Sequence, residues 1–268
     1  MAEIIVDDHV IKFNRILAFG CSYTAGWETR DHEIMNITDE ECDEIKRASE
    51  GPQSFIRLML GVDIHGISYT GSYIKFLADH FGVEWKNYAF AGSSLDFSVY
   101  EIERLRNENK ITDNDLIVVG LPCPNRLFYL KESEHDTPIQ LQMSTQHAWP
   151  TEDFYHTYAT EIGSGKNLIW RYYQQLQHLL MLNEKLNNRI IMLPMSNSFA
   201  EWAEWLDPKE DWTKRINEIN FSVPFKFDVI DKFHKSTDTD CHGFLHPKLH
   251  HHEEFAKKIH EHLTRDCV

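Results

Sequence analysis

Residues 15–27 read RILAFGCSYTAGW, a short apolar run followed by a turn that contains a serine. Its short apolar run, 16–19, ends at Gly20, a pattern typical of a strand that is covered on both faces of a sheet. Gly20 allows the backbone to turn sharply, which places Ser22 just beyond the carboxyl end of that strand. Open α/β sheets bind their ligands at this end. Ser22 is therefore a candidate nucleophile, although a serine in this position also commonly caps the next helix.

Strands and helices alternate along the rest of the chain. Further strands are predicted at 4–6, 85–89, 116–120 and 189–193, and amphipathic helices at 72–81, 97–107, 168–186 and from 249 onward. This alternation predicts right-handed crossovers between parallel strands. We expect an α/β protein, namely a three-layer α/β/α sandwich of the flavodoxin-like type with a mostly parallel five-stranded sheet.

The whole chain, residues 1–268, is expected to form a single domain. Residues 131–165 show no clear periodicity and predict an irregular insertion, of the kind that often forms a lid or a binding loop. Residues 198–230 contain three tryptophans, which we interpret as packing residues or as part of a cover over the site.

Charge and cysteine content limit the classes of function. The formal net charge of −15 argues against partners that are themselves anionic, such as nucleic acid or acidic membrane surfaces. The five cysteines form neither an even framework nor a CxxC pair, which favours a reducing compartment. The amino terminus lacks the basic and apolar regions of a signal peptide, and no apolar run is long enough to span a membrane. We expect a soluble protein that is made in the cytoplasm and has no cofactor.

A second strand-to-helix junction lies at residues 87–96, which read NYAFAGSSLD. Backbone amides at the start of a helix point outward and suit an anion or a developing oxyanion. The alternative interpretation is that Ser94 or Asp96 only caps the helix that follows. A third loop, 121–126, follows the buried strand 116–120 and contains Asn125.

Histidines are concentrated near the carboxyl terminus, where His246-Pro247 precedes the last predicted helix. Three interpretations are open for them. The first is a zinc site, whose possible ligands are Asp240, Cys241, His242 and His246. The second is a set of surface residues, which is the default for His250, His251, His260 and His262. In the third, His246 is the base that activates Ser22 and is oriented by an acidic neighbour.

Three blocks of the sequence, taken together, resemble the SGNH (GDSL-like) hydrolases. Residues 19–24 resemble the Gly-x-Ser-x-Thr turn of the first block, residues 87–94 resemble the second, and residues 246–256 resemble the last. The blocks occur in family order, and the chain is most similar to the SGNH-like proteins of tailed phages. The resemblance implies that Ser22 is the nucleophile and His246 the general base, with the amides of Ser22 and Gly92 stabilising the oxyanion.

Two positions depart from the family pattern. The family usually has an aspartate three residues before the histidine, where this chain has Gly243, so Asp240 or Asp238 substitutes or His246 acts in a dyad. The asparagine of the third block is missing from its usual place, and Asn125 is the nearby candidate for the oxyanion hole.

Two functions from different classes follow. The first is a serine esterase or acetylhydrolase that acts through an acyl-enzyme on a small ester or an O-acetylated carbohydrate. The second is a catalytically weak or inactive structural or binding protein, associated with a phage particle.

Overall fold

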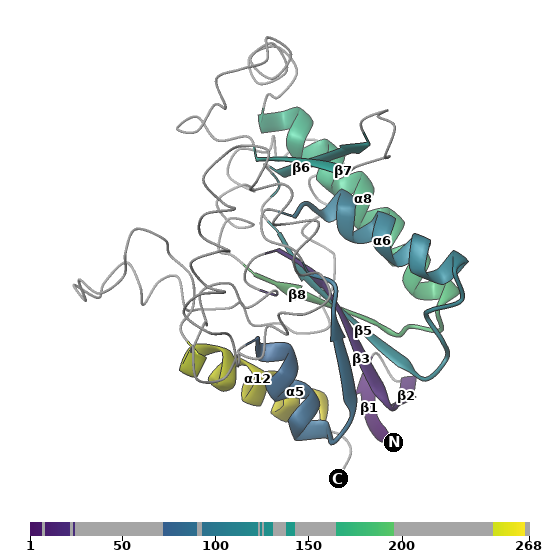
Figure 1. The fold of residues 1–268 in the computed structure, drawn as a ribbon, viewed down its shortest axis with the longest axis vertical. Coiled ribbons are helices and arrows are strands. Elements are labelled where there is room, and N and C mark those ends of the chain that lie inside the picture. The colour runs from purple at the N-terminus through teal and green to yellow at the C-terminus, as the bar shows by residue number, and fades with distance from the viewer. Residues whose placement is uncertain are drawn as a thin grey trace, which may run out of the picture.

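A computed structural model describes residues 1–6, 9–21, 24, 72–89, 93–122, 124, 126–130, 138–142, 165–195 and 249–265. In this part of the chain the central sheet has four parallel strands in the order β4-β3-β5-β8 (Figure 1). Their bounds are β3 Arg15–Gly20, β4 Glu84–Asn87, β5 Asp115–Leu121 and β8 Ile190–Pro194. The predicted parallel strands are therefore confirmed to within one or two residues at their ends.

The strand order identifies the sheet as doubly wound. Numbered along the chain, the four strands lie in the order 2-1-3-4, as in flavodoxin-like sheets. The chain leaves β3 toward one edge and leaves β5 toward the other, so the winding reverses between these two strands. The topological switch point, where such sheets bind ligands, therefore lies beyond Gly20 and Gly120, which pair with each other.

Two helical layers cover the sheet (Figure 1). One contains α5, Tyr73–Phe81, and α12, Leu249–Leu263; the other contains α6, Leu95–Asn107, and α8, Gly165–Lys185. Along β3, Ile16 and Ala18 pack in the core with α5 and α12, whereas Leu17 and Phe19 pack with α6 and α8. Successive strand residues point to opposite faces, so a strand between two helical layers must be apolar throughout. This confirms the three-layer sandwich.

Caps and apolar stripes define the helices. The Ser72 side chain caps α5 by accepting a hydrogen bond from the amide of Ile74, and Gly82 ends that helix in the left-handed region at φ 64°. The Ser94 side chain caps α6 by accepting from the amide of Phe97, which confirms the capping interpretation of Ser94. In α12, the amphipathic helix predicted from 249 onward, His252, Ala256, Ile259 and Leu263 are buried on one face.

Two hairpins differ from expectation. The strand predicted at 4–6 is β1, Ala2–Val6, but it pairs antiparallel with β2, His9–Phe13, and stays outside the central sheet, which thus has four described strands rather than five. Its alternating burial suits a sheet with one covered face, unlike β3, which is buried from Ile16 to Gly20. Within the segment expected to be irregular, β7, Pro138–Gln142, pairs with β6, Arg126–Leu130. Residues 198–230 lie outside the described residues.

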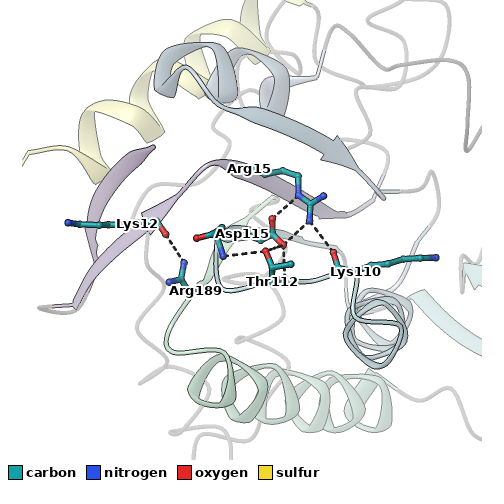
Figure 2. Close-up of polar contacts among 7 residues, drawn as sticks. Lys12, Arg15, Lys110, Thr112, Asp115 and Arg189 are labelled. Atoms are coloured by element: carbon teal, nitrogen blue, oxygen red, sulfur yellow. Dashed lines mark hydrogen bonds and ion pairs between the residues drawn. The ribbon is translucent and has the colours of Figure 1, made fainter.

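An ion pair joins the amino ends of β3 and β5 (Figure 2). The Arg15 guanidinium donates through Nε to Oδ1 of Asp115 at 2.7 Å and through Nη2 to Oδ2 at 2.8 Å. The same carboxylate accepts from the Thr112 amide at 2.7 Å and from the Thr112 hydroxyl at 3.0 Å. This hydrogen bonding to Asp115 raises the pKa of Arg15. Because Asp115 is only 1% exposed, its charge depends on these partners.

We therefore expect Asp115→Asn to lower the free energy of unfolding by about 2–3 kcal/mol, because it removes the charge from a buried acceptor with several donors. Urea unfolding followed by circular dichroism measures the change. The matched control is Glu261→Gln, which removes an exposed carboxylate 4.0 Å from Lys257 and should leave stability unchanged. Equal effects of the two substitutions would show that the ion pair contributes nothing specific.

Candidate active site

The candidate catalytic and oxyanion residues all lie outside the described residues: Ser22, Gly92, Asn125, Asp240 and His246. Their roles and mutual distances stay predictions. The same holds for Asp238 and for the alternative zinc ligands Cys241 and His242. The structure describes elements that precede or follow these residues in the sequence.

Three of the candidates follow neighbouring parallel strands. Ser22 comes two residues after the end of β3, Gly92 five residues after the end of β4, and Asn125 four residues after the end of β5. These strands are neighbours in the sheet and run in one direction, so their carboxyl ends share one edge. His246 precedes α12, which packs on one face of the same sheet.

Thr24, two residues after Ser22, is held on both its backbone and its side chain. Its carbonyl oxygen accepts hydrogen bonds from the Ser72 hydroxyl at 2.7 Å and from the Asn87 side-chain amide at 2.9 Å. Its hydroxyl lies 3.3 Å from the Tyr73 hydroxyl. Thr24 is fully buried, so the chain just after the serine turn is fixed to the start of α5 and the end of β4.

Two glycines leave the space that the Thr24 side chain occupies. Gly20 has φ +143°, and a Cβ there would lie 2.6 Å from both the Gly120 carbonyl oxygen and Thr24 Oγ1. A Cβ at Gly120 would overlap Thr24 Oγ1 and lie 3.1 Å from Cγ of Met195. The close approach of β3, β5 and Thr24 therefore requires glycine at both positions.

His252 holds the start of α12 against the start of α5. Its Nδ1 accepts a hydrogen bond from the Tyr73 amide at 3.1 Å, and its ring stacks on the Tyr73 ring at a centroid distance of 6.0 Å. The Tyr73 amide is one of the first-turn donors that a helix cannot satisfy itself. Because Nδ1 accepts, the neutral ring carries its proton on Nε2.

Tyr73 contacts both Thr24 and His252. Burial raises the pKa of the Tyr73 phenol above its ordinary value, so the hydroxyl keeps its proton at neutral pH. Tyr73 is completely buried, and its ring also meets Phe255 edge-on at a centroid distance of 5.0 Å.

Sequence reasoning missed this polar cluster. Thr24 is part of the turn motif, Gly120 ends a predicted strand and His252 belongs to the predicted carboxy-terminal helix. No local pattern shows that Thr24 and His252 both contact Tyr73. The only local signal is a polar residue at a buried position of an amphipathic helix, which His252 provides.

The start of α6 is built from side-chain caps. Ser93 is buried and its hydroxyl donates to the Ser94 carbonyl oxygen at 3.2 Å. Asp96, the other proposed cap, has its carboxylate 2.8 Å from Nη2 of Arg171 on α8. The helix that follows Gly92 is thus tied to its neighbour.

Among the described residues, no three histidine, cysteine or carboxylate side chains are grouped so as to hold a metal ion. In the same part of the chain, no helix has both the length and the apolar character needed to cross a membrane.

We expect Gly120→Ala to destabilise the fold by about 2 kcal/mol because the new methyl group overlaps Thr24 Oγ1. The cost should be smaller in a Thr24→Ala background, since that change removes the overlapping atom. A double-mutant cycle on the unfolding free energy measures this coupling.

Gly82→Ala is the control for that cycle. It introduces a Cβ at a positive φ but meets no atom within 4 Å, so it should be equally costly with and without Thr24→Ala. A Gly120→Ala cost that does not depend on Thr24 would contradict the steric explanation.

No family model matches the chain, and no curated protein matches it. Among solved structures it is similar to the psychrotrophic esterase EstA from Pseudoalteromonas sp., in a form inhibited by monoethylphosphonate, with a TM-score of 0.45 and 11% identity over 94% of this chain and 97% of that chain. It is also similar to a carbohydrate esterase whose active site displays divergent catalytic and non-catalytic binding functions, with a TM-score of 0.47 and 12% identity over 95% of this chain and 69% of that chain.

Proposed function

We propose that the chain is a serine esterase or acetylhydrolase that acts through an acyl-enzyme on a small ester or an O-acetylated carbohydrate. The observation that carries the proposal is the anchoring of Thr24. It fixes the chain two residues after Ser22, next to the switch point between β3 and β5. Fixing the segment that bears a nucleophile lowers the entropic cost of reaction.

In the proposed reaction the Ser22 hydroxyl attacks the ester carbonyl carbon while His246 takes its proton. The carbon–oxygen bond to the alcohol breaks, and the alcohol leaves with the proton that His246 returns. Water, deprotonated by His246, then attacks the acyl carbon; the bond from Ser22 Oγ to that carbon breaks, His246 returns the proton to Ser22 Oγ, and the carboxylic acid is released. The amides of Ser22 and Gly92 and the side chain of Asn125 stabilise the oxyanion in both steps.

An acyl-enzyme mechanism of this kind needs no metal or organic cofactor. A neutral ester also suits the charge of the chain, because a net charge of −15 repels anionic ligands but has no such effect on neutral ones.

The second candidate function is a structural or binding protein of a phage particle that keeps the fold without the chemistry. The departures at Gly243 and Asn125 favour it, because they remove the usual acid and one usual oxyanion donor. The loss of one oxyanion donor alone costs on the order of a hundredfold or more in rate.

A fluorophosphonate probe separates the two functions. If the proposal holds, the wild-type protein gains one probe adduct, and both Ser22→Ala and His246→Ala abolish it, because only an activated serine reacts. Intact mass spectrometry measures the adduct, and circular dichroism verifies that each variant is folded. Ser98→Ala changes a buried serine of α6 outside the proposed site and should label like wild type. A folded wild type that does not label would favour the structural protein.

The carboxylate that orients His246 can be identified by comparing kcat/KM for the hydrolysis of 4-nitrophenyl acetate between variants. We expect Asp240→Asn to lower kcat/KM by roughly a hundredfold or more, since the histidine would lose its tautomer and orientation. Asp238→Asn is the matched control and should change kcat/KM by less than about twofold. The reverse pattern would assign the role to Asp238, and no effect of either change would assign a dyad.

A further inference from the structure

We infer that Tyr73 is a positioning residue that sets the serine turn against the start of the carboxy-terminal helix. Its consequence for catalysis rests on the proposed function, because it concerns the geometry of Ser22 relative to His246. Tyr73 is completely buried, so its role would be exerted through its neighbours and not on a substrate.

The hydroxyl of Tyr73 makes the contact to the serine turn. It lies 3.3 Å from Thr24 Oγ1, and both atoms are buried. The Thr24 carbonyl oxygen also accepts hydrogen bonds from Ser72 and Asn87. The Thr24 side chain fills the space beside Gly20 and Gly120. Thr24 therefore cannot shift without breaking several contacts at once.

The amide and ring of Tyr73 make the contact to the carboxy-terminal helix. The amide donates to His252 Nδ1 at 3.1 Å, the two rings are almost parallel at 6°, and Phe255 packs edge-on against the Tyr73 ring. His252 is in the first turn of α12, six residues after His246. A single residue thus contacts two segments that come from opposite ends of the sequence.

Such a link matters for a nucleophile and base supplied by distant segments. Misplacement by about 1 Å can cost on the order of a hundredfold in rate. The sheet fixes β3 and the apolar stripe fixes α12, but packing of apolar surfaces tolerates small rotations and shifts. Directional hydrogen bonds to Thr24 and His252 remove that freedom.

Tyr73→Phe removes the contact to Thr24 and keeps the ring and the amide. We expect the rate of fluorophosphonate labelling and kcat to fall about fivefold, the factor that corresponds to one hydrogen bond, while KM stays within about twofold. His252→Phe keeps a ring for stacking but removes the acceptor for the Tyr73 amide, and a similar fall is expected. His252→Asn restores an acceptor near the position of Nδ1 and should recover part of the rate.

Tyr73→Phe and His252→Phe each break one half of the same connection between Thr24 and His252. The fall in labelling rate in the double variant should therefore be clearly smaller than the product of the two separate falls. Tyr172→Phe is the matched control, because Tyr172 is a buried tyrosine of α8 on the other face of the sheet. It should label at the wild-type rate. A positioning role predicts the split between kcat and KM and the non-additivity, whereas a general loss of stability predicts neither.

Hydrogen exchange tests the link without relying on activity. Amides of the segment that contains Gly20 to Thr24 should exchange faster in Tyr73→Phe, and amides at the starts of α5 and α12 should exchange faster in His252→Phe. If wild type labels with the probe but Tyr73→Phe labels equally fast, the inference is overturned and the proposed function stands. If wild type never labels, the proposed function fails; faster exchange then upholds the link, and unchanged exchange overturns it.

Discussion

The register in which β3 pairs with β5 determines which residues meet at both ends of these two central strands. The two strands align from Arg15 with Asp115 to Gly20 with Gly120. A shift by one residue would turn every side chain of one strand to the opposite helical layer. It would also separate the ion pair at the amino ends and the two glycines at the carboxyl ends. Burial of apolar side chains stabilises the pairing of the two strands. The ion pair at one end and the close approach of the two glycines at the other favour this register over shifted ones.

The register has different consequences at the two ends of the strands. At the amino ends, the Asp115 carboxylate accepts hydrogen bonds from Arg15 and Thr112 (Figure 2). Parallel sheets of this kind bind ligands at the opposite, carboxyl ends of their strands. At the carboxyl ends the two glycines bring β3 and β5 close enough for Thr24 to be buried beside them. The strand order reverses at the same place, and the next described helix after β3, α5, packs on the opposite face of the sheet from α8, which precedes β8. The ion pair and the buried Thr24 therefore lie at opposite ends of the same pair of strands.

The fold could be predicted from the sequence because its signals are local. The apolar runs at β3, β5 and β8, and the helical periods between them, each follow from covering a sheet on two faces. The β1–β2 and β6–β7 hairpins were harder because they lie outside the central sheet. The contacts of Thr24 and Tyr73 could not be predicted, since they join residues that are far apart in sequence and depend on the final packing. The roles of Ser22 and His246 stay predictions from the sequence, and the structure describes only elements that precede or follow them along the chain.

The buried polar cluster of Thr24, Tyr73 and His252 adds less to the free energy of unfolding than an apolar core of the same size would. Every buried hydroxyl and imidazole must be stripped of water, and its hydrogen bonds in the protein largely offset that cost without adding much stability. Apolar side chains of the same size would fill the space between α5, α12 and the end of β3 at least as well. What the cluster adds is direction, because hydrogen bonds hold Thr24 and His252 at defined angles where apolar contacts would not. A fixed geometry benefits a protein that must bring a nucleophile and a base together from opposite ends of its chain, and it gives no comparable benefit to an inert scaffold.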